Sequence, residues 1–139
     1  MGLTKKKREG DLKTPKGKFN FILLLYRKDR IPKIKSNIKK IIIKKNMGWC
    51  DNPKSPYYNK LIKFSYEKNA EKLYLKKNIY DLILVLNYNM KPVVKNRGSA
   101  IFLHLATKNF KPTKGCLAIK KRFLVKILPL ITKNTHLFI

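Results

Sequence analysis

The sequence is short of cysteine, histidine and acidic residues. Its 139 residues include two cysteines (Cys50 and Cys116), two histidines (His104 and His136) and seven Asp or Glu. Two cysteines cannot build a disulfide-rich framework, and neither lies at a spacing typical of metal ligands. We therefore expect reduced thiols and no metal site. A bridge between Cys50 and Cys116 is the alternative if the fold brings them together.

Long apolar runs are lacking as well. No run reaches the length of a membrane-spanning helix, so we expect no transmembrane segment. Residues 1–11 are polar and basic and lead into no apolar stretch, so no signal peptide is visible. We expect these eleven residues to be mobile. The apolar fraction of 44% is that of a globular protein, and the length predicts one domain over residues 1–139.

The scarcity of acids leaves a formal net charge of +27. Such a charge would suit nucleic acid, anionic lipid or an acidic polymer. However, 29 of the 34 basic residues are lysine, beside 15 Ile and 12 Asn, and these are the residues of AT-rich codons. The lysines are also spread from end to end, and a nucleic-acid binder would favour arginine for bidentate contacts. Nucleic acid is therefore not the primary partner that we predict.

What the sequence does contain is a series of short apolar, β-branched runs separated by turn residues. A helical turn is predicted around Leu73, and one helix near the C-terminus has apolar residues at helical spacing and ends at Pro129. The fold class that we predict is mostly β, a mixed sheet folded into a sandwich or barrel-like shape with one C-terminal helix. The expected strands are 18–26, 38–45, 61–65, 79–88, 100–103 and 135–139, with the helical turn over 69–77 and the helix over 120–128.

Chemistry concentrates in residues 98–119, GSAIFLHLATKNFKPTKGCLAI. A buried strand would end at His104, and a loop of Lys, Asn, Pro, Thr and Gly would return Cys116 to it. A thiol next to an imidazole can lose its proton to that base and act as a nucleophile. Gly115 permits a tight turn, which would leave main-chain N–H groups near the thiol to face an oxyanion. The alternative is a buried structural cysteine and a structural histidine.

These residues resemble a known signature. His104-Leu105-Ala106 and residues 113–118 (TKGCLA) are similar to the active site of the L,D-transpeptidase catalytic domain, or YkuD-type, family. The family pattern is a His, a loop, and Ser/Thr-His-Gly-Cys followed by an apolar residue. Upstream, DLKTPKGKF (11–19) resembles the family's Thr-Pro-x-Gly-x-aromatic segment. The blocks GWCDNP (48–53), YYN (57–59) and GSAIFLH (98–104) resemble a short, single-domain bacterial branch. The resemblance therefore covers essentially the whole chain, in order.

The sequence departs from the family pattern at two positions near the cysteine. Lys114 stands where many members have a second His, and Ala118 stands where many have an Arg that could hold a substrate carboxylate. The loop between His104 and Cys116 is also short. These differences leave the nucleophile and the base in place and bear on substrate recognition.

The resemblance implies an L,D-transpeptidase, a cysteine acyltransferase that acts on peptidoglycan stem peptides through an acyl-thioester. Cys116 would be the nucleophile and His104 the general base, with Gly115 and Thr113 supporting the oxyanion and the loop. The family needs no cofactor, is acylated by carbapenem β-lactams, and has its substrate in the cell envelope. We expect a monomer. The alternatives are an L,D-carboxypeptidase or amidase with the same pair, an inactive relative that binds wall peptide, and a basic protein that binds nucleic acid or another anionic polymer.

Several further side chains are candidates for substrate binding. Trp49, Asp51 and Tyr58 belong to an aromatic-rich loop over 48–59, and Arg97 and Ser99 precede the predicted strand. The simpler interpretation is that the aromatic residues fill an edge of the core and that Arg97 is solvated.

Asp81 lies in an apolar run, where a buried carboxylate needs partners. It would either orient His104 or make a structural hydrogen bond.

Overall fold

The longest strand, β3 (Lys18–Tyr26), is the axis of the computed structural model, which describes residues 2–139. One edge of β3 pairs antiparallel with β8 (Leu82–Leu86). The opposite edge pairs with β11 (His136–Phe138), antiparallel, and with β4 (Lys40–Ile42), parallel. Beyond β8 come β9 (Phe102–Leu105), antiparallel to β8, and β10 (Leu117–Ile119), parallel to β9. The result is a six-stranded mixed sheet.

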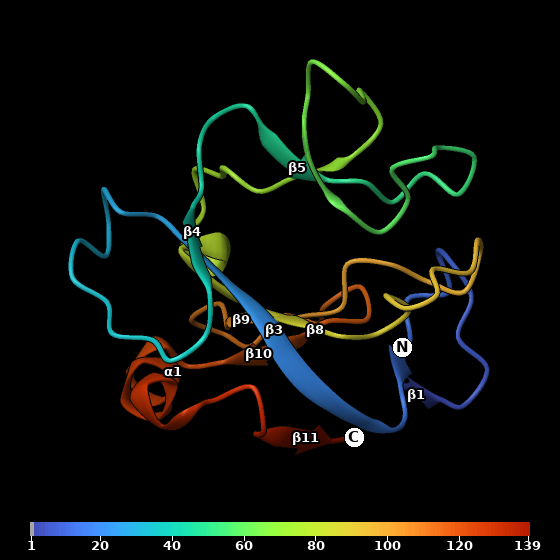
Figure 1. The fold of residues 1–139 in the computed structure, drawn as a ribbon. Coiled ribbons are helices and arrows are strands. Elements are labelled where there is room, and N and C mark those ends of the chain that lie inside the picture. The colour runs from blue at the N-terminus through green and yellow to red at the C-terminus, as the bar shows by residue number, and fades with distance from the viewer. Residues whose placement is uncertain (1) are drawn as a thin grey trace.

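Two smaller sheets accompany the main one. Strand β5 (Met47–Trp49) pairs with β6 (Leu61–Lys63) and β7 (Glu71–Lys72) on its two edges. Near the N-terminus, β1 (Leu3–Thr4) pairs in parallel with β2 (Thr14–Pro15). Figure 1 shows the β5 sheet on one side of the main sheet and α1 (Lys121–Ile127) on the other.

The core divides into two clusters because the central strands are buried on both faces. Along β8, Leu82, Leu84 and Leu86 contact the cluster on the α1 side, which includes Leu124. Ile83 and Val85 alternate with them and belong to the other cluster, under the β5 sheet. The protein is therefore mostly β, a mixed-sheet sandwich with one short C-terminal helix. Within residues 2–139 no helix has the length and apolar character to cross a membrane.

Several predicted strands are present with shorter bounds, and the helix is confirmed as α1, which continues into the 3-10 turn η2 (Leu128–Leu130) around Pro129. The helical turn predicted over 69–77 is wrong. Glu71 and Lys72 instead pair with Trp49 and Gly48 of β5, because a segment this short forms a helix poorly when a strand edge is available. The helical turn lies immediately after it, as η1 (Asn78–Tyr80).

The strand predicted over 100–103 is displaced by two residues. Ala100 has a φ of 51°, outside the range of a strand, and β9 begins at Phe102. As predicted, a strand carries His104, and it continues one residue further, to Leu105. The predicted strand over 38–45 is reduced to β4, and the predicted loop over 48–59 begins with two residues of β5.

The segment predicted to be mobile folds back onto the molecule in its described part, residues 2–11. Lys7 is buried and forms an ion pair with Asp11. The main-chain N–H of Glu9 donates to the Asn96 carbonyl at 2.8 Å. These contacts make residues 7–12 a wall of the candidate site, described next.

Candidate active site

One cavity of about 580 Å³ collects side chains from distant parts of the chain. His104 lines it from β9, and Cys116 lines it from the position just before β10. Parallel pairing places Leu117 beside Leu103 and Ala118 beside His104. The loop after β9 therefore returns the chain to the same strand. The structure brings the two sequence-predicted residues to one cavity.

The turn before Cys116 requires glycine. Gly115 has a φ of 102°, and a Cβ atom there would meet the Lys13 carbonyl oxygen at 2.7 Å. The Thr113 hydroxyl donates to the Cys116 carbonyl at 2.5 Å, which closes the turn around the cysteine. The Cys116 thiol donates to the Ala100 carbonyl at 3.1 Å. The thiol is thus held against the start of β9 by the loop residues that the sequence singled out.

Burial raises the pKa of the Cys116 thiol to about 12. A main-chain hydrogen bond from Phe102 and the charge of Lys7 lower this pKa, and the charge of Glu71 raises it. Burial lowers the pKa of His104 below its ordinary value of 6.5. Both shifts favour the uncharged forms, so at neutral pH the site holds a neutral thiol and a neutral imidazole.

His104 has its tautomer set by its own strand. Its Nδ1 lies 3.0 Å from the Leu105 carbonyl oxygen, which can only accept a hydrogen bond. Nδ1 therefore carries the proton, and Nε2 keeps the lone pair that a general base needs. The ring also packs edge-on against Tyr80, with ring centroids 5.3 Å apart.

Asp81 makes a structural hydrogen bond and does not orient His104. Its carboxylate accepts from Arg30 at 2.6 Å and from the Asn78 amide at 2.8 Å. Arg30 also donates to the main chain at Lys76, which ties η1 to the loop after β3. This is the second of the two interpretations that the sequence allowed.

Glu71 and Tyr80 also line the cavity, and sequence reasoning missed both. The Tyr80 hydroxyl donates to the Glu71 carboxylate, and burial raises the pKa of Glu71. Glu71 was not selected because a helical turn was predicted over 69–77. The residue instead lies in β7, from which it lines the cavity. Tyr80 was not selected because it lies in the apolar run 79–88, for which a strand was predicted.

The predicted substrate-binding residues separate into three groups. Asp51 and Ser99 line the cavity. Trp49 and Tyr58 are buried in the core: the Trp49 ring packs edge-on against Phe102, with centroids 5.3 Å apart. Arg97 lines a different, neighbouring cavity.

Glu9 is a further residue that sequence reasoning missed, because it lies in the segment expected to be mobile. Its carboxylate accepts from the Tyr58 hydroxyl at 2.5 Å and from the Ser99 hydroxyl at 2.7 Å. Tyr58 therefore acts on the site indirectly, by fixing a wall residue.

The two cysteines are both free thiols, and Cys50 is completely buried. The Cys50–Cys116 bridge is therefore not formed. Over the described residues 2–139, no three His, Cys, Asp or Glu side chains are grouped so that they could hold a metal ion.

The fold and the site together define a class: a mostly β domain in which a loop between two parallel strands brings a thiol to the cavity that a histidine also lines. The family model of the L,D-transpeptidase catalytic domain matches residues 1–139, the whole chain. The chain belongs to this family, whose members act on peptidoglycan, and the resemblance seen in the motifs is confirmed. The comparisons with curated proteins and with solved structures gave no match.

Proposed function

We propose that this protein is an L,D-transpeptidase that uses Cys116 to form an acyl-thioester with a peptidoglycan stem peptide. The observation that carries the proposal is the shared cavity of Cys116 and His104, in which the Nε2 of His104 is the free base. The donor would be a tetrapeptide stem, cut before its terminal D-alanine.

The neutral resting pair sets the order of the proton transfers. Nε2 of His104 takes the thiol proton as Sγ of Cys116 attacks the donor carbonyl. Main-chain N–H groups at Gly115 and Cys116 stabilise the oxyanion. The imidazolium then gives its proton to the departing D-alanine amine, which leaves the acyl-thioester. An acceptor amine attacks the thioester, His104 takes its proton, and the thiol is restored.

Water in place of the amine would make the protein an L,D-carboxypeptidase or amidase with the same two residues. The substrate class implies that the protein works in the cell envelope, as we propose, and that carbapenems acylate Cys116. A monomer suffices for this chemistry, since every residue named above comes from one chain.

The first experiment is intact mass spectrometry after reaction with a carbapenem, with wild type, Cys116→Ser and Cys50→Ser compared. We expect one covalent adduct that is lost only in Cys116→Ser. Cys50→Ser is the matched control, because that thiol is buried outside the cavity. An adduct that disappears with Cys50, or no adduct on wild type with both thiols shown to be free, would count against the proposal.

Stem-peptide turnover with and without an acceptor amine then separates transfer from hydrolysis. Cross-linked product that grows with acceptor concentration is the expected result. Free acid as the product with and without acceptor would favour the carboxypeptidase or amidase over the transpeptidase. Salt-sensitive DNA binding that survives Cys116→Ala, without any turnover, would favour the nucleic-acid alternative.

A further inference from the structure

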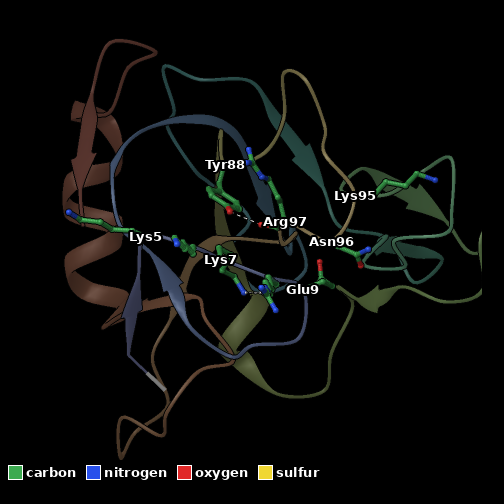
Figure 2. A pocket seen from close by; sticks show the side chains of 9 residues that line it. Lys5, Lys7, Glu9, Tyr88, Lys95, Asn96 and Arg97 are labelled. Atoms are coloured by element: carbon green, nitrogen blue, oxygen red, sulfur yellow. Dashed lines mark hydrogen bonds between the residues drawn. The ribbon is translucent and has the colours of Figure 1, made fainter.

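A second cavity, of about 760 Å³, adjoins the candidate active site. It forms where residues 5–9 pass the turn 95–97, and Figure 2 shows Lys5 and Lys7 on one side of it and Lys95 and Asn96 on the other. We call it the basic pocket and define it by its six cationic side chains, which are Lys5, Lys6, Lys7, Arg8, Lys95 and Arg97.

Most of this charge has no carboxylate partner. Lys7 is the exception, being ion-paired with Asp11. Glu9 is the single acid in the lining, and its Oε2 accepts hydrogen bonds from the hydroxyls of Tyr58 and Ser99. The three ion pairs among residues 2–139 use none of the other five cations of the basic pocket. Five cationic side chains of the pocket are therefore available to bind an anionic ligand.

The concentration of arginine distinguishes this pocket from the general lysine excess. Of the five arginines in the chain, Arg27 and Arg30 are ion-paired within the fold. Two of the remaining three, Arg8 and Arg97, line the basic pocket. A guanidinium presents a planar fork that fits a carboxylate with two hydrogen bonds, which an ammonium cannot do.

The turn that carries Lys95 and Arg97 is rigidly held. The Asn89 amide nitrogen donates to the carbonyls of Val94 and Gly98, each at 2.9 Å, and its oxygen accepts from the Val94 N–H at 2.8 Å. The Tyr88 hydroxyl donates to the Arg97 carbonyl at 2.5 Å. The pocket is thus preorganised, which lowers the cost of binding a ligand.

The two cavities share a wall. Lys7 and Glu9 line both, and the charge of Lys7 is near enough to Cys116 to lower the pKa of its thiol. A ligand whose anionic part lies in the basic pocket could pass this wall and present another group to Cys116.

We propose that the basic pocket binds the carboxylate groups of the acceptor peptide, the second substrate. This inference rests on the proposed function. A stem peptide ends in a carboxylate, and Arg8 and Arg97 would hold it while the acceptor amine meets the acyl-thioester. The amine nitrogen forms the new bond to the acyl carbon, and the bond from that carbon to Sγ of Cys116 breaks. His104 carries the amine proton to the departing thiolate.

The test compares wild type with the double variant Arg8→Ala/Arg97→Ala, with a tetrapeptide donor and increasing acceptor peptide. Cross-linked and hydrolysed products are measured by mass spectrometry. The matched control is Lys121→Ala/Lys126→Ala, which removes two exposed cations from α1. A second acceptor has its carboxylates capped as amides and keeps its amine.

We expect the acceptor concentration at half-maximal transfer to rise about tenfold in the double variant and to stay unchanged in the control. Carbapenem acylation and donor hydrolysis should be equal in all three proteins. The capped acceptor should need the same high concentration in wild type and in the double variant.

Equal acceptor dependence in wild type and the double variant would overturn the inference, as would an equal loss in the control or a double-variant effect that persists with the capped acceptor. Hydrolysis without transfer at every acceptor concentration would also overturn the inference, but it would leave the formation of an acyl-enzyme on Cys116 supported. Failure of Cys116 to acylate would overturn the proposed function, and the inference with it.

Discussion

At the scale of the residue, the resting ionisation of Cys116 and His104 decides how the site reacts. Burial favours a neutral thiol and a neutral imidazole, so no thiolate–imidazolium pair is formed in advance. In the proposed mechanism, the thiol therefore gives its proton to His104 during the attack. This differs from cysteine enzymes whose nucleophile is a thiolate at rest.

The first prediction concerns pH. Because the proposed mechanism requires the base form of His104, carbapenem acylation should rise with pH through a pKa below 6.5 and then stay level to about pH 9. The thiol pKa of about 12 places its own ionisation above this range. Stopped-flow acylation rates from pH 4.5 upward test this, and a bell-shaped profile with both limbs below pH 9 would indicate a preformed ion pair.

The second prediction concerns Glu71, whose negative charge raises the pKa of Cys116. Glu71→Gln should lower that pKa, because it removes the negative charge and keeps an acceptor for the Tyr80 hydroxyl. The pH dependence of iodoacetamide alkylation measures the change at Cys116. Tyr80→Phe serves as the comparison, because it removes the hydrogen bond and leaves the carboxylate.

An unchanged or higher thiol pKa in Glu71→Gln would contradict the second prediction. The two positions also show what residue patterns can reveal. Cys116 and His104 are rare residue types in this chain, so they could be selected by sequence alone. Glu71 is one of seven acids, and only the pairing of β7 with β5 brings it into the cavity.

At the scale of the element, the turn into β10 positions Cys116, the proposed nucleophile. We predict that Gly115→Ala destabilises the fold by about 1–3 kcal/mol, because a positive φ and the Lys13 carbonyl both oppose a Cβ there. Displacement of Cys116 should slow acylation by about tenfold to a hundredfold. Urea unfolding and carbapenem acylation measure the two effects.

Gly10→Ala is the matched control, because Gly10 has a φ of 74° and a Cβ atom added there would have no other atom within 4 Å. Gly10→Ala should therefore show only the destabilisation caused by a positive φ, without the steric clash that a Cβ meets at residue 115. Equal acylation losses in the two variants would show that the close approach to Lys13 does not matter.

The N-terminal segment gives the fourth prediction. Burial acts to raise the pKa of Asp11, but hydrogen bonds from the main chain of Arg8 and Lys13 and from Lys7 outweigh it and lower the pKa to about 2. The ionised form therefore stabilises the fold above about pH 3.8, and this contribution is lost as the pH falls through about 2.

Asp11→Ala should cost about 1–3 kcal/mol at pH 7, because it leaves the buried Lys7 ammonium without its partner. Its free energy of unfolding should also fall less than that of wild type between pH 4 and pH 2. Urea unfolding across this range provides the measurement, and parallel curves for the two proteins would contradict the assignment.

Elements were predictable from sequence where one local signal dominated. The strand at 18–26 has a long apolar run, and the helix at 121–127 has the matching periodicity. The short strands β5 and β7 could not be predicted, since their pairing depends on partners that lie far along the chain. The contacts of residues 2–11 were missed for the same reason: they are made with residues 58, 96 and 99.

At the scale of the whole molecule, the net charge of +27 must oppose compaction. We predict that the melting temperature rises when NaCl is increased from 20 to 300 mM, because salt screens the repulsion among the lysines. Calorimetry tests this. A melting temperature that falls as NaCl is added would contradict the prediction.

The shared wall of the two cavities also bears on how the chain can change in evolution. Exposed loops and turns usually tolerate the gain or loss of a residue. Between Glu9 and Asp11, a single insertion or deletion would displace Lys7 and Glu9 together relative to Asp11, and so disturb the ion pair of Lys7 and the hydrogen bonds of Glu9 with Tyr58 and Ser99. The spacing of this short segment is therefore constrained like that of a core strand, and point substitutions are the route by which either cavity could be modified separately.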